Sequence, residues 1–126
     1  MNLKEKIKIL DFKVIGDERG KLVAIESLKD VPFEIKRIFY IYGTDQNAIR
    51  GQHANKKSEF VLINVCGSCK VRIYDEDEEY VVDLDRPNIG LYIPPLVWKD
   101  MYCFSNDSVL LTLSNNYYDK DEYIRK

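Results

Sequence analysis

The chain has 126 residues, of which 45% are hydrophobic and 32% charged, and its formal net charge is −2. This length suits one domain with a real core, which we expect to span residues 1–126. The charge balance gives no basic field for nucleic acid, and no apolar run approaches the ~20 residues of a membrane span. Residues 1–6 are charged and lack a signal-peptide core, so we expect a cytoplasmic protein that binds neither nucleic acid nor a membrane.

Short apolar or alternating runs follow one another along the chain and are separated by turn residues such as Gly67-Ser68 and Pro94-Pro95. No segment before residue 115 has sustained helical periodicity. The tail from Tyr117 onward is polar and aromatic and fits a short helix or an extended arm. The spacing predicts an all-β sandwich or barrel, with strands at 7–15, 21–26, 35–42, 59–65, 69–74, 79–84, 89–93, 97–103 and 108–114.

Alternation along two of these strands predicts which side chains share a face. In the strand at 35–42, Arg37 and Phe39 point to one side, whereas Ile38 and Tyr40 point to the other. In the strand at 59–65, one face carries Glu59, Val61, Ile63 and Val65, and the other carries Phe60, Leu62 and Asn64. Inward positions of a small barrel either fill the core or line a ligand cavity.

Three cysteines do not make a disulfide framework. Cys66-Gly67-Ser68-Cys69 matches the C-x-x-C pattern, whose redox versions begin a helix that lowers the thiol pKa. Here the motif lies between two predicted strands, and we interpret it as a tight hairpin. A metal site needs three or more clustered ligands. Because the chain has one histidine, we expect no metal and no cofactor.

The segment Arg50-Gly51-Gln52-His53 is the most informative stretch, because His53 is the only histidine in the chain. An unperturbed imidazole has a pKa of ~6.5, which suits proton transfer near neutral pH. Arginine offers a planar fork of donors that suits phosphate. A base next to an anion clamp indicates acid–base chemistry on a phosphorylated small molecule, such as removal of a proton next to a carbonyl. The alternative interpretation is an exposed loop histidine.

Three arginines are candidates for the anion clamp. Arg50 lies next to the histidine, Arg19 lies in a turn at 17–20, and Arg37 lies on the strand that leads to the site. Each of them could equally be a solvated surface charge. Two arginines that converge on one anion would far less often be accidental.

Several short motifs occur in a characteristic order over nearly the whole chain. They are Asp17-Glu18-Arg19-Gly20, Pro32-Phe33-Glu34-Ile35-Lys36-Arg37, Arg50-Gly51-Gln52-His53-Ala54, Gly67-Ser68, Gly90-Leu91-Tyr92-Ile93, Trp98, Phe104-Ser105, Tyr117-Tyr118-Asp119 and Tyr123-Ile124-Arg125. Through these motifs the chain resembles the nucleotide-sugar 3,4-ketoisomerases, cupin enzymes that act on dTDP-4-keto-6-deoxyglucose. The wider superfamily of dTDP-sugar 3,5-epimerases shares a similar Arg-Gly-x-His segment, in which the histidine is the base.

The resemblance implies a small cupin jelly-roll barrel with a short C-terminal tail, and a homodimer that exchanges N-terminal strands. The implied reaction is isomerisation of a dTDP-4-keto-6-deoxyhexose to its 3-keto isomer through an enediol. The product would go to an aminotransferase, in bacterial deoxyaminosugar synthesis for surface glycans such as the O-antigen of lipopolysaccharide.

The resemblance also implies roles for individual residues. His53 would remove the C3 proton, and a proton would return at C4. Arg50 and Arg19 would bind the pyrophosphate, with Arg19 supplied by the partner subunit if strands are exchanged. The expected catalytic set is His53, Tyr40, Asn55 and Asp100. The expected substrate-binding set is Arg19, Arg37, Arg50, Tyr92, Trp98, Lys99 and Glu59.

Two departures from the family pattern affect the proton relay. The family typically reads His-Ala-His where this chain has His53-Ala54-Asn55, and relatives often have a histidine where this chain has Lys99. Asn55 cannot take a proton, so we expect another group to shuttle the second one. The candidates are Asp100, Glu59, Tyr40 and Tyr92, and also Lys99 if its pKa were strongly lowered.

Two other functions stay open at this point. One is a nucleotide-sugar 3,5-epimerase-like enzyme, which needs the same base but different proton positions. The other is a non-catalytic cupin that binds a sugar nucleotide, with Asn55 marking lost chemistry.

Overall fold

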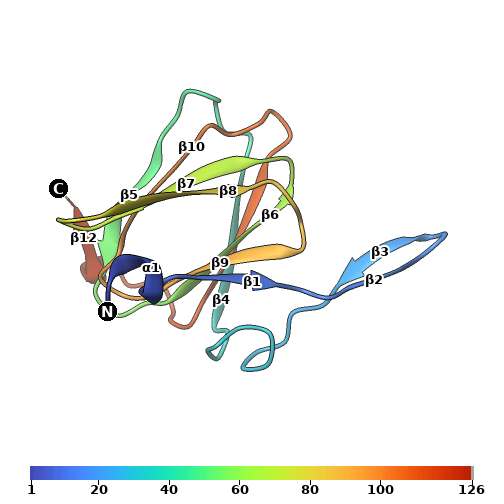
Figure 1. The fold of residues 1–126 in the computed structure, drawn as a ribbon, viewed down its shortest axis with the longest axis horizontal. Helices are drawn as coiled ribbons and strands as arrows, with labels where there is room; N and C mark the ends of the chain where they lie inside the picture. Colours follow the sequence, from blue (N-terminus) through green and yellow to red (C-terminus); the bar gives the residue numbers. More distant parts are fainter. Residues whose placement is uncertain (126) are drawn as a thin grey trace.

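The computed structural model describes residues 1–125, which fold into two facing five-stranded antiparallel sheets and a projecting hairpin (Figure 1). The first sheet has the order β1-β9-β6-β11-β4, with bounds Lys8–Asp11, Ile89–Ile93, Phe60–Cys66, Val109–Ser114 and Arg37–Tyr42. The second has the order β12-β5-β10-β7-β8, with bounds Tyr123–Arg125, Arg50–Asn55, Trp98–Tyr102, Cys69–Tyr74 and Glu79–Leu84. The remaining elements are α1 (Leu3–Lys6), the hairpin strands β2 (Val14–Asp17) and β3 (Gly20–Val23), and the 3₁₀ helix η1 (Lys120–Glu122).

The main core lies between the two sheets. Phe60 and Leu62 enter it from the first sheet, and Val71 and Ile73 enter it from the second. Neighbouring residues of β6 point the other way, because side chains alternate along a strand. They belong to a second buried cluster on the outer face of the first sheet, which residues 25–35 cover with Ile25, Val31, Phe33 and Ile35. The predicted alternation of this strand is therefore confirmed.

The prediction of an all-β fold is confirmed, although the two sheets do not close into one continuous barrel. The predicted strand at 7–15 is two strands, because the chain breaks at Phe12, which is buried in the outer cluster. The tail is both a short helix, η1, and an extended strand, β12.

The Cys66–Cys69 segment is a turn, but the prediction of a hairpin was wrong. β6 and β7 belong to different sheets, so the turn carries the chain from one sheet to the other. Gly67 has φ +71°, and a Cβ there would collide with Ser105 and Asp107. Backbone and side-chain hydrogen bonds between Ser68 and Ser105 fix the turn.

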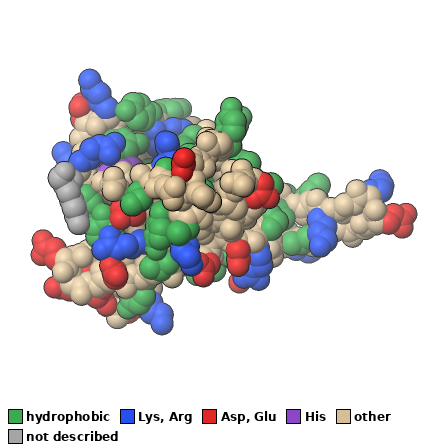
Figure 2. All heavy atoms as spheres, turned by 90° about the horizontal axis from the view of Figure 1, so that it is seen from above, with side chains coloured by type: hydrophobic (Ala, Val, Ile, Leu, Met, Phe, Trp, Pro, Cys, Tyr) green, Lys and Arg blue, Asp and Glu red, His purple; other side chains and the backbone are tan. Residues whose placement is uncertain are grey.

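The hairpin of β2 and β3 projects from the body of the molecule (Figure 1), and both hydrophobic and charged side chains lie along it (Figure 2). All four residues of β2 are exposed, including Val14 and Ile15. A two-stranded hairpin is marginal in water when it stands alone. In the part of the chain that the structure describes, no helix is both long and apolar enough to cross a membrane.

Candidate active site

A cavity of about 600 Å³ opens between the two sheets near the C-terminal segment. Phe39, Phe60 and Leu62 line it from the first sheet, while His53 and Lys99 line it from the second. The C-terminal segment closes one side with Tyr118, Lys120, Tyr123 and Arg125. The cavity is thus apolar on one wall, polar on the other and aromatic at its side.

The charges around this cavity have one sign. Arg50, Lys99, Lys120 and Arg125 line it, and its described lining contains no carboxylate. Converging cations without counter-charges attract anions and bind phosphate oxygens well. The cavity therefore suits a ligand that carries phosphate groups.

A β-bulge in β5 places His53 on the cavity wall. Gly51 has φ +85° and Gln52 has φ +58°, and the pairing of β5 with β10 shifts register between Lys99 and Asp100. A Cβ at Gly51 would come within 2.8 Å of the carbonyl oxygen of Lys99, so the close approach requires glycine. The bulge brings the next residue, His53, directly opposite Lys99 across the strands.

The hydrogen bond of His53 defines its tautomer. Its Nδ1 lies 3.0 Å from the carbonyl oxygen of Gly51, and a carbonyl can only accept, so Nδ1 carries the proton. Nε2 is then the basic nitrogen. Burial lowers the pKa of His53 to about 4, and the charge of Lys99 acts in the same direction. At neutral pH this imidazole is a neutral base, with its ring 4.7 Å from the Tyr123 ring.

Lys99 is the second acid–base group on this wall. Its side chain is buried, its Nζ lies 3.3 Å from Asn55 Oδ1, and the ammonium lies 4.3 Å from the Phe60 ring centroid. Burial lowers the pKa of Lys99 to about 7, although the charge of Glu122 acts in the opposite direction. A lowered pKa is the condition under which Lys99 can move a proton near neutral pH, and its role in proton transfer stays a prediction.

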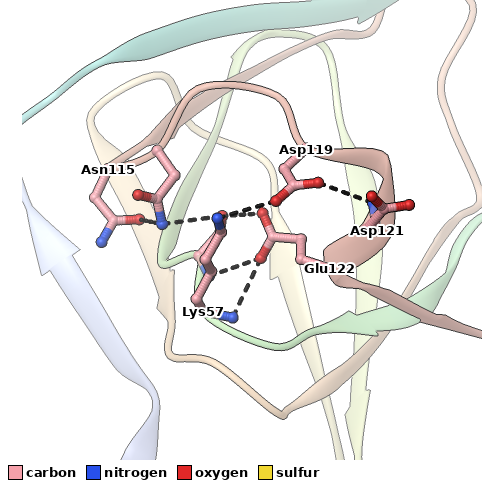
Figure 3. A network of polar contacts seen from close by, with 7 residues as sticks. Lys57, Asn115, Asp119, Asp121 and Glu122 are labelled. Atoms are coloured by element: carbon pink, nitrogen blue, oxygen red, sulfur yellow. Dashed lines mark hydrogen bonds and ion pairs between the residues drawn. The ribbon is translucent and has the colours of Figure 1, made fainter.

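A network around Glu122 anchors the C-terminal segment (Figure 3). The buried Glu122 carboxylate accepts hydrogen bonds from the Ser58 hydroxyl, the Ser58 N–H at 2.9 Å and the Lys57 N–H at 3.2 Å. Lys57 also pairs with Asp119 at 3.0 Å. Burial raises the pKa of Glu122, but the hydrogen bonds from Ser58 and Lys57 outweigh it, and the pKa is lowered. The network holds β12 against β5 and so fixes Tyr123 and Arg125 at the cavity.

Asp100 does not face the cavity. It points to the other side of β10 from Lys99, because side chains alternate along the strand. There its carboxylate accepts hydrogen bonds from Arg72 at 3.2 Å and from the Tyr74 hydroxyl at 3.1 Å. Asp100 lines a neighbouring hollow of about 390 Å³, and Trp98, on the same face of β10, stacks on Tyr74.

Tyr40, Glu59 and Tyr92 also lie outside the described lining of the cavity, on the outer face of the first sheet. The Tyr92 hydroxyl donates to Glu59, beneath the ring of Phe33. Tyr40 is 60% exposed on β4. In the single chain these three residues do not share the cavity with His53, because each alternates with a residue that does face inward, and their roles in the reaction stay predictions.

The three arginines occupy different places. Arg50 lines the cavity. Arg19 lies at the tip of the projecting hairpin, with 85% of its side chain exposed, and pairs with Asp17. Arg37 lies between Phe39 and Tyr118, both of which line the cavity, with buried Nε and Nη2 atoms that have no hydrogen-bond partner among the described residues. Within one chain, Arg37 and Arg50 are therefore near the cavity and Arg19 is not.

Sequence reasoning assigned no role to Lys120, Tyr123 and Arg125. The signal that could have found them is the concentration of tyrosines and charged residues after residue 116, in a chain whose predicted strands already account for the core. What the sequence could not show is that this segment returns to pair with β5.

Two other kinds of site considered from the sequence are a metal site and a reactive C-x-x-C pair. The described residues contain no cluster of three or more histidine, cysteine, aspartate or glutamate side chains able to bind a metal ion, and the expected metal-independent reaction stays a prediction. Burial raises the pKa of Cys69 to about 12, which leaves it a poor nucleophile. The C-x-x-C pattern is thus part of a turn between sheets.

Two facing β-sheets with a cavity between them are typical of a cupin-like domain, and the cationic lining favours an anionic ligand. The family model described as "FdtA: WxcM-like, C-terminal" matches residues 5–126, and the chain belongs to this family.

Its relatives include characterised sugar-nucleotide enzymes. It is 47% identical over 119 residues to TDP-4-oxo-6-deoxy-alpha-D-glucose-3,4-oxoisomerase of Aneurinibacillus thermoaerophilus, covering 94% of this chain and 86% of the relative. A histidine-to-asparagine variant of the 3,4-ketoisomerase QdtA of Thermoanaerobacterium thermosaccharolyticum, in complex with TDP-4-keto-6-deoxyglucose, superimposes with a TM-score of 0.94 and 44% identity, over 96% of this chain and 88% of the other. The TDP-quinovose 3,4-ketoisomerase WlaRB of Campylobacter jejuni gives a TM-score of 0.93 and 46% identity, over 97% and 94% of the two chains.

Proposed function

We propose that this protein is an isomerase that converts a dTDP-4-keto-6-deoxyhexose to its 3-keto isomer by proton transfer through an enediol. The observation that carries the proposal is the neutral imidazole of His53, with its proton on Nδ1, on the wall of a cationic cavity. Relatives that are 44–47% identical over nearly the whole chain are 3,4-ketoisomerases or oxoisomerases of such sugars.

Different residues of the cavity bind the diphosphate, pack against the sugar ring and transfer the proton. Arg50, Lys120 and Arg125 bind the diphosphate, because they are the exposed cations of the cavity lining, whereas Lys99 is buried. The apolar wall of Phe39 and Phe60 packs against the sugar ring and excludes water from it. His53 then takes the proton from C3, next to the 4-keto group, whose carbonyl makes that proton acidic.

Two alternatives remain less favoured. A 3,5-epimerase-like enzyme would use the same base but would keep the ketone at C4, and the relatives of high identity are not described as epimerases. A binding protein without catalysis would not need a neutral imidazole whose tautomer is fixed by a backbone bulge.

We further propose that the molecule is a homodimer that exchanges its N-terminal strands. The hairpin of β2 and β3 exposes Val14, Ile15 and Leu22, and the edge strand β4 exposes Ile38 and Tyr40. A second copy of the chain would cover both apolar surfaces. It would give the hairpin, which is marginal alone, an apolar surface to pack against. Arg19 at the hairpin tip is then delivered to the partner, where it contributes to diphosphate binding.

The substrate and location follow from the same proposal. The enzyme works in the cytoplasm as one cupin domain spanning residues 1–126. Its product feeds an aminotransferase that makes a 3-amino-3,6-dideoxysugar for a surface glycan.

Incubation with TDP-4-keto-6-deoxyglucose in D₂O tests the function. We expect a 3-keto product with deuterium at C4, seen by NMR, and His53→Asn should lower turnover by ~10²–10⁴-fold while the protein still binds TDP. Deuterium at C3 and C5 with the ketone kept at C4 would identify an epimerase. Absence of any exchange would identify a binding protein.

A further inference from the structure

One feature of the cavity has no part in the proposed C3 step: the buried amine beside the imidazole. Lys99 and His53 are register partners on β10 and β5, so their side chains leave the sheet side by side on the cavity face. Residues opposite each other in such a pair have Cβ atoms about 5 Å apart. Both groups can therefore reach one sugar ring.

The surroundings of Lys99 orient its amine and, among the described residues, give it no direct ion pair. Its described hydrogen bond is to Asn55 Oδ1, and an aromatic ring covers one side of the ammonium. No ion pair to Lys99 occurs among the described salt bridges, and the buried Glu122 carboxylate is engaged by Ser58 and Lys57. A buried lysine without a paired carboxylate is costly to keep charged. Such an amine gives up its proton far more readily than a surface lysine.

We propose that Lys99 donates the proton that arrives at C4, so that the isomerisation uses two groups: His53 to remove and Lys99 to return. Asn55 is then a positioning residue, because its amide oxygen holds the Lys99 amine next to the cavity. This inference rests on the proposed function and names the acid that the family's second histidine would otherwise supply.

The proton and electron balance is complete. His53 Nε2 takes the C3 proton, the C3–H pair becomes the C3=C4 bond, and the carbonyl pair moves onto O4. The O3 hydroxyl passes its proton to the neighbouring O4. A lone pair on O3 then forms the C3 carbonyl while the C3=C4 pair takes a proton from the Lys99 ammonium at C4. The imidazolium loses its proton to water and the neutral amine gains one, which restores the starting state without an oxidant or reductant.

Two rates measured in D₂O separate this role from others. One is the wash-in of deuterium at C3 of recovered substrate, which reports His53, and the other is formation of the 3-keto product. In Lys99→Met, product formation should fall by ~10²–10⁴-fold while C3 exchange persists, so the ratio of exchange to product should rise at least ~10-fold. Lys99→Arg should behave like Lys99→Met, because a guanidinium keeps its charge but not a transferable proton.

Lys120→Met is the matched control, since it removes another cavity lysine without touching His53. It should weaken binding of TDP, measured by calorimetry, and leave the ratio of exchange to product unchanged. A near-normal rate in Lys99→Arg would show that only positive charge is needed and would overturn the proposal. An equal loss of exchange and product in Lys99→Met would assign Lys99 a structural role and would do the same.

The wild-type enzyme gives a test that no folding defect can obscure. When substrate deuterated at C3 is turned over in H₂O, a mechanism in which His53 removes one proton and Lys99 donates another predicts that C4 receives only solvent hydrogen. Transfer of C3 deuterium to C4 would mean that His53 returns the proton alone. If wild-type enzyme makes no 3-keto product, the proposed function itself is refuted. That result differs from the two outcomes of the Lys99 variants that would overturn only the role of Lys99.

Discussion

At the scale of single residues, the cavity contains two ionisable groups whose pKa values are moved by burial. Burial lowers the pKa of His53 to about 4 and that of Lys99 to about 7. At pH values between these two, the imidazole is neutral and the amine is charged. Environments that separate the protonation of two neighbouring groups are typical of acid–base assignments.

We therefore predict the pH dependence of turnover. His53 acts as a base only above about pH 4, and Lys99 acts as an acid only below about pH 7, so kcat/KM should be highest between them and fall about tenfold per pH unit on the alkaline side. The charges that act on the pair are Glu122, which raises the pKa of Lys99, and Arg125, which lowers that of His53. The measurement is kcat/KM from about pH 5 to about pH 9.

The residual activity of Lys99→Arg should lack this alkaline fall, because arginine stays protonated throughout. An identical alkaline limb in wild type and Lys99→Arg would assign the titration to another group.

At the scale of elements, a strand of three residues completes the cavity. β12 pairs with β5 and places Tyr123 opposite Asn55 and Arg125 opposite His53. So short a strand contributes little by itself. The buried Glu122 before it is bonded to Ser58 and Lys57, and this attachment keeps the segment in place.

Replacing Glu122 with Ala should destabilise the protein by about 2–4 kcal/mol, because it leaves the buried donors of Ser58 and the part-buried N–H of Lys57 without their acceptor. The free energy of unfolding is measured by urea titration at neutral pH. Since hydrogen bonding lowers the pKa of Glu122 in the folded state, its contribution is present at neutral pH and is lost as pH falls through the folded pKa. The difference between wild type and variant should shrink in acid. Asp121→Ala, at the neighbouring exposed position, should change stability by less than about 0.5 kcal/mol. An equal loss in both variants would contradict the special role of Glu122.

The element that sequence reasoning missed is the one that carries the base. Residues 50–55 have no apolar alternation, and Gly51 and Gln52 adopt left-handed backbone conformations that a pattern of strand residues does not indicate. The strand forms because tertiary pairing with β10 and β12 outweighs local propensity. By contrast, β6 and β11 were predicted closely, because buried apolar runs bounded by turns are strong signals.

Some residues of the candidate site could be predicted from the sequence, whereas others could not. The sole histidine and Arg50 could be found because their residue types are chemically specific. Asp100 could not be separated from Lys99 without knowing which face of β10 is inward, because a one-residue offset reverses every side chain. The inward face is identified by the pairing of Lys99 with Ile73 of β7, a core residue.

At the scale of the whole molecule, the projecting hairpin is the feature that a single chain does not explain. Its apolar side chains are exposed and Arg19 at its tip lies away from the cavity of its own chain. Strand exchange would bury these apolar side chains and give Arg19 a role in substrate binding.

Mixing Arg19→Ala chains with His53→Asn chains tests this arrangement. If Arg19 serves the partner's cavity, each mixed dimer has one site with both defects and one site with neither. Activity should then recover to a substantial fraction of wild type, compared with either variant alone. The dimer should be verified by light scattering. No recovery in confirmed mixed dimers would mean that Arg19 serves its own chain.

Strand β10 separates two environments that share a boundary. Lys99 and Met101 face the cavity, while Trp98 faces the opposite side, where Asp100 lines the neighbouring hollow. Gln52 and Arg125 belong to both hollows. The only tryptophan of the chain is therefore one residue removed from the proposed acid, on the face of β10 that also carries Asp100. We expect the fluorescence of this tryptophan to report ligand binding without a label, from a position outside the lining of the cavity.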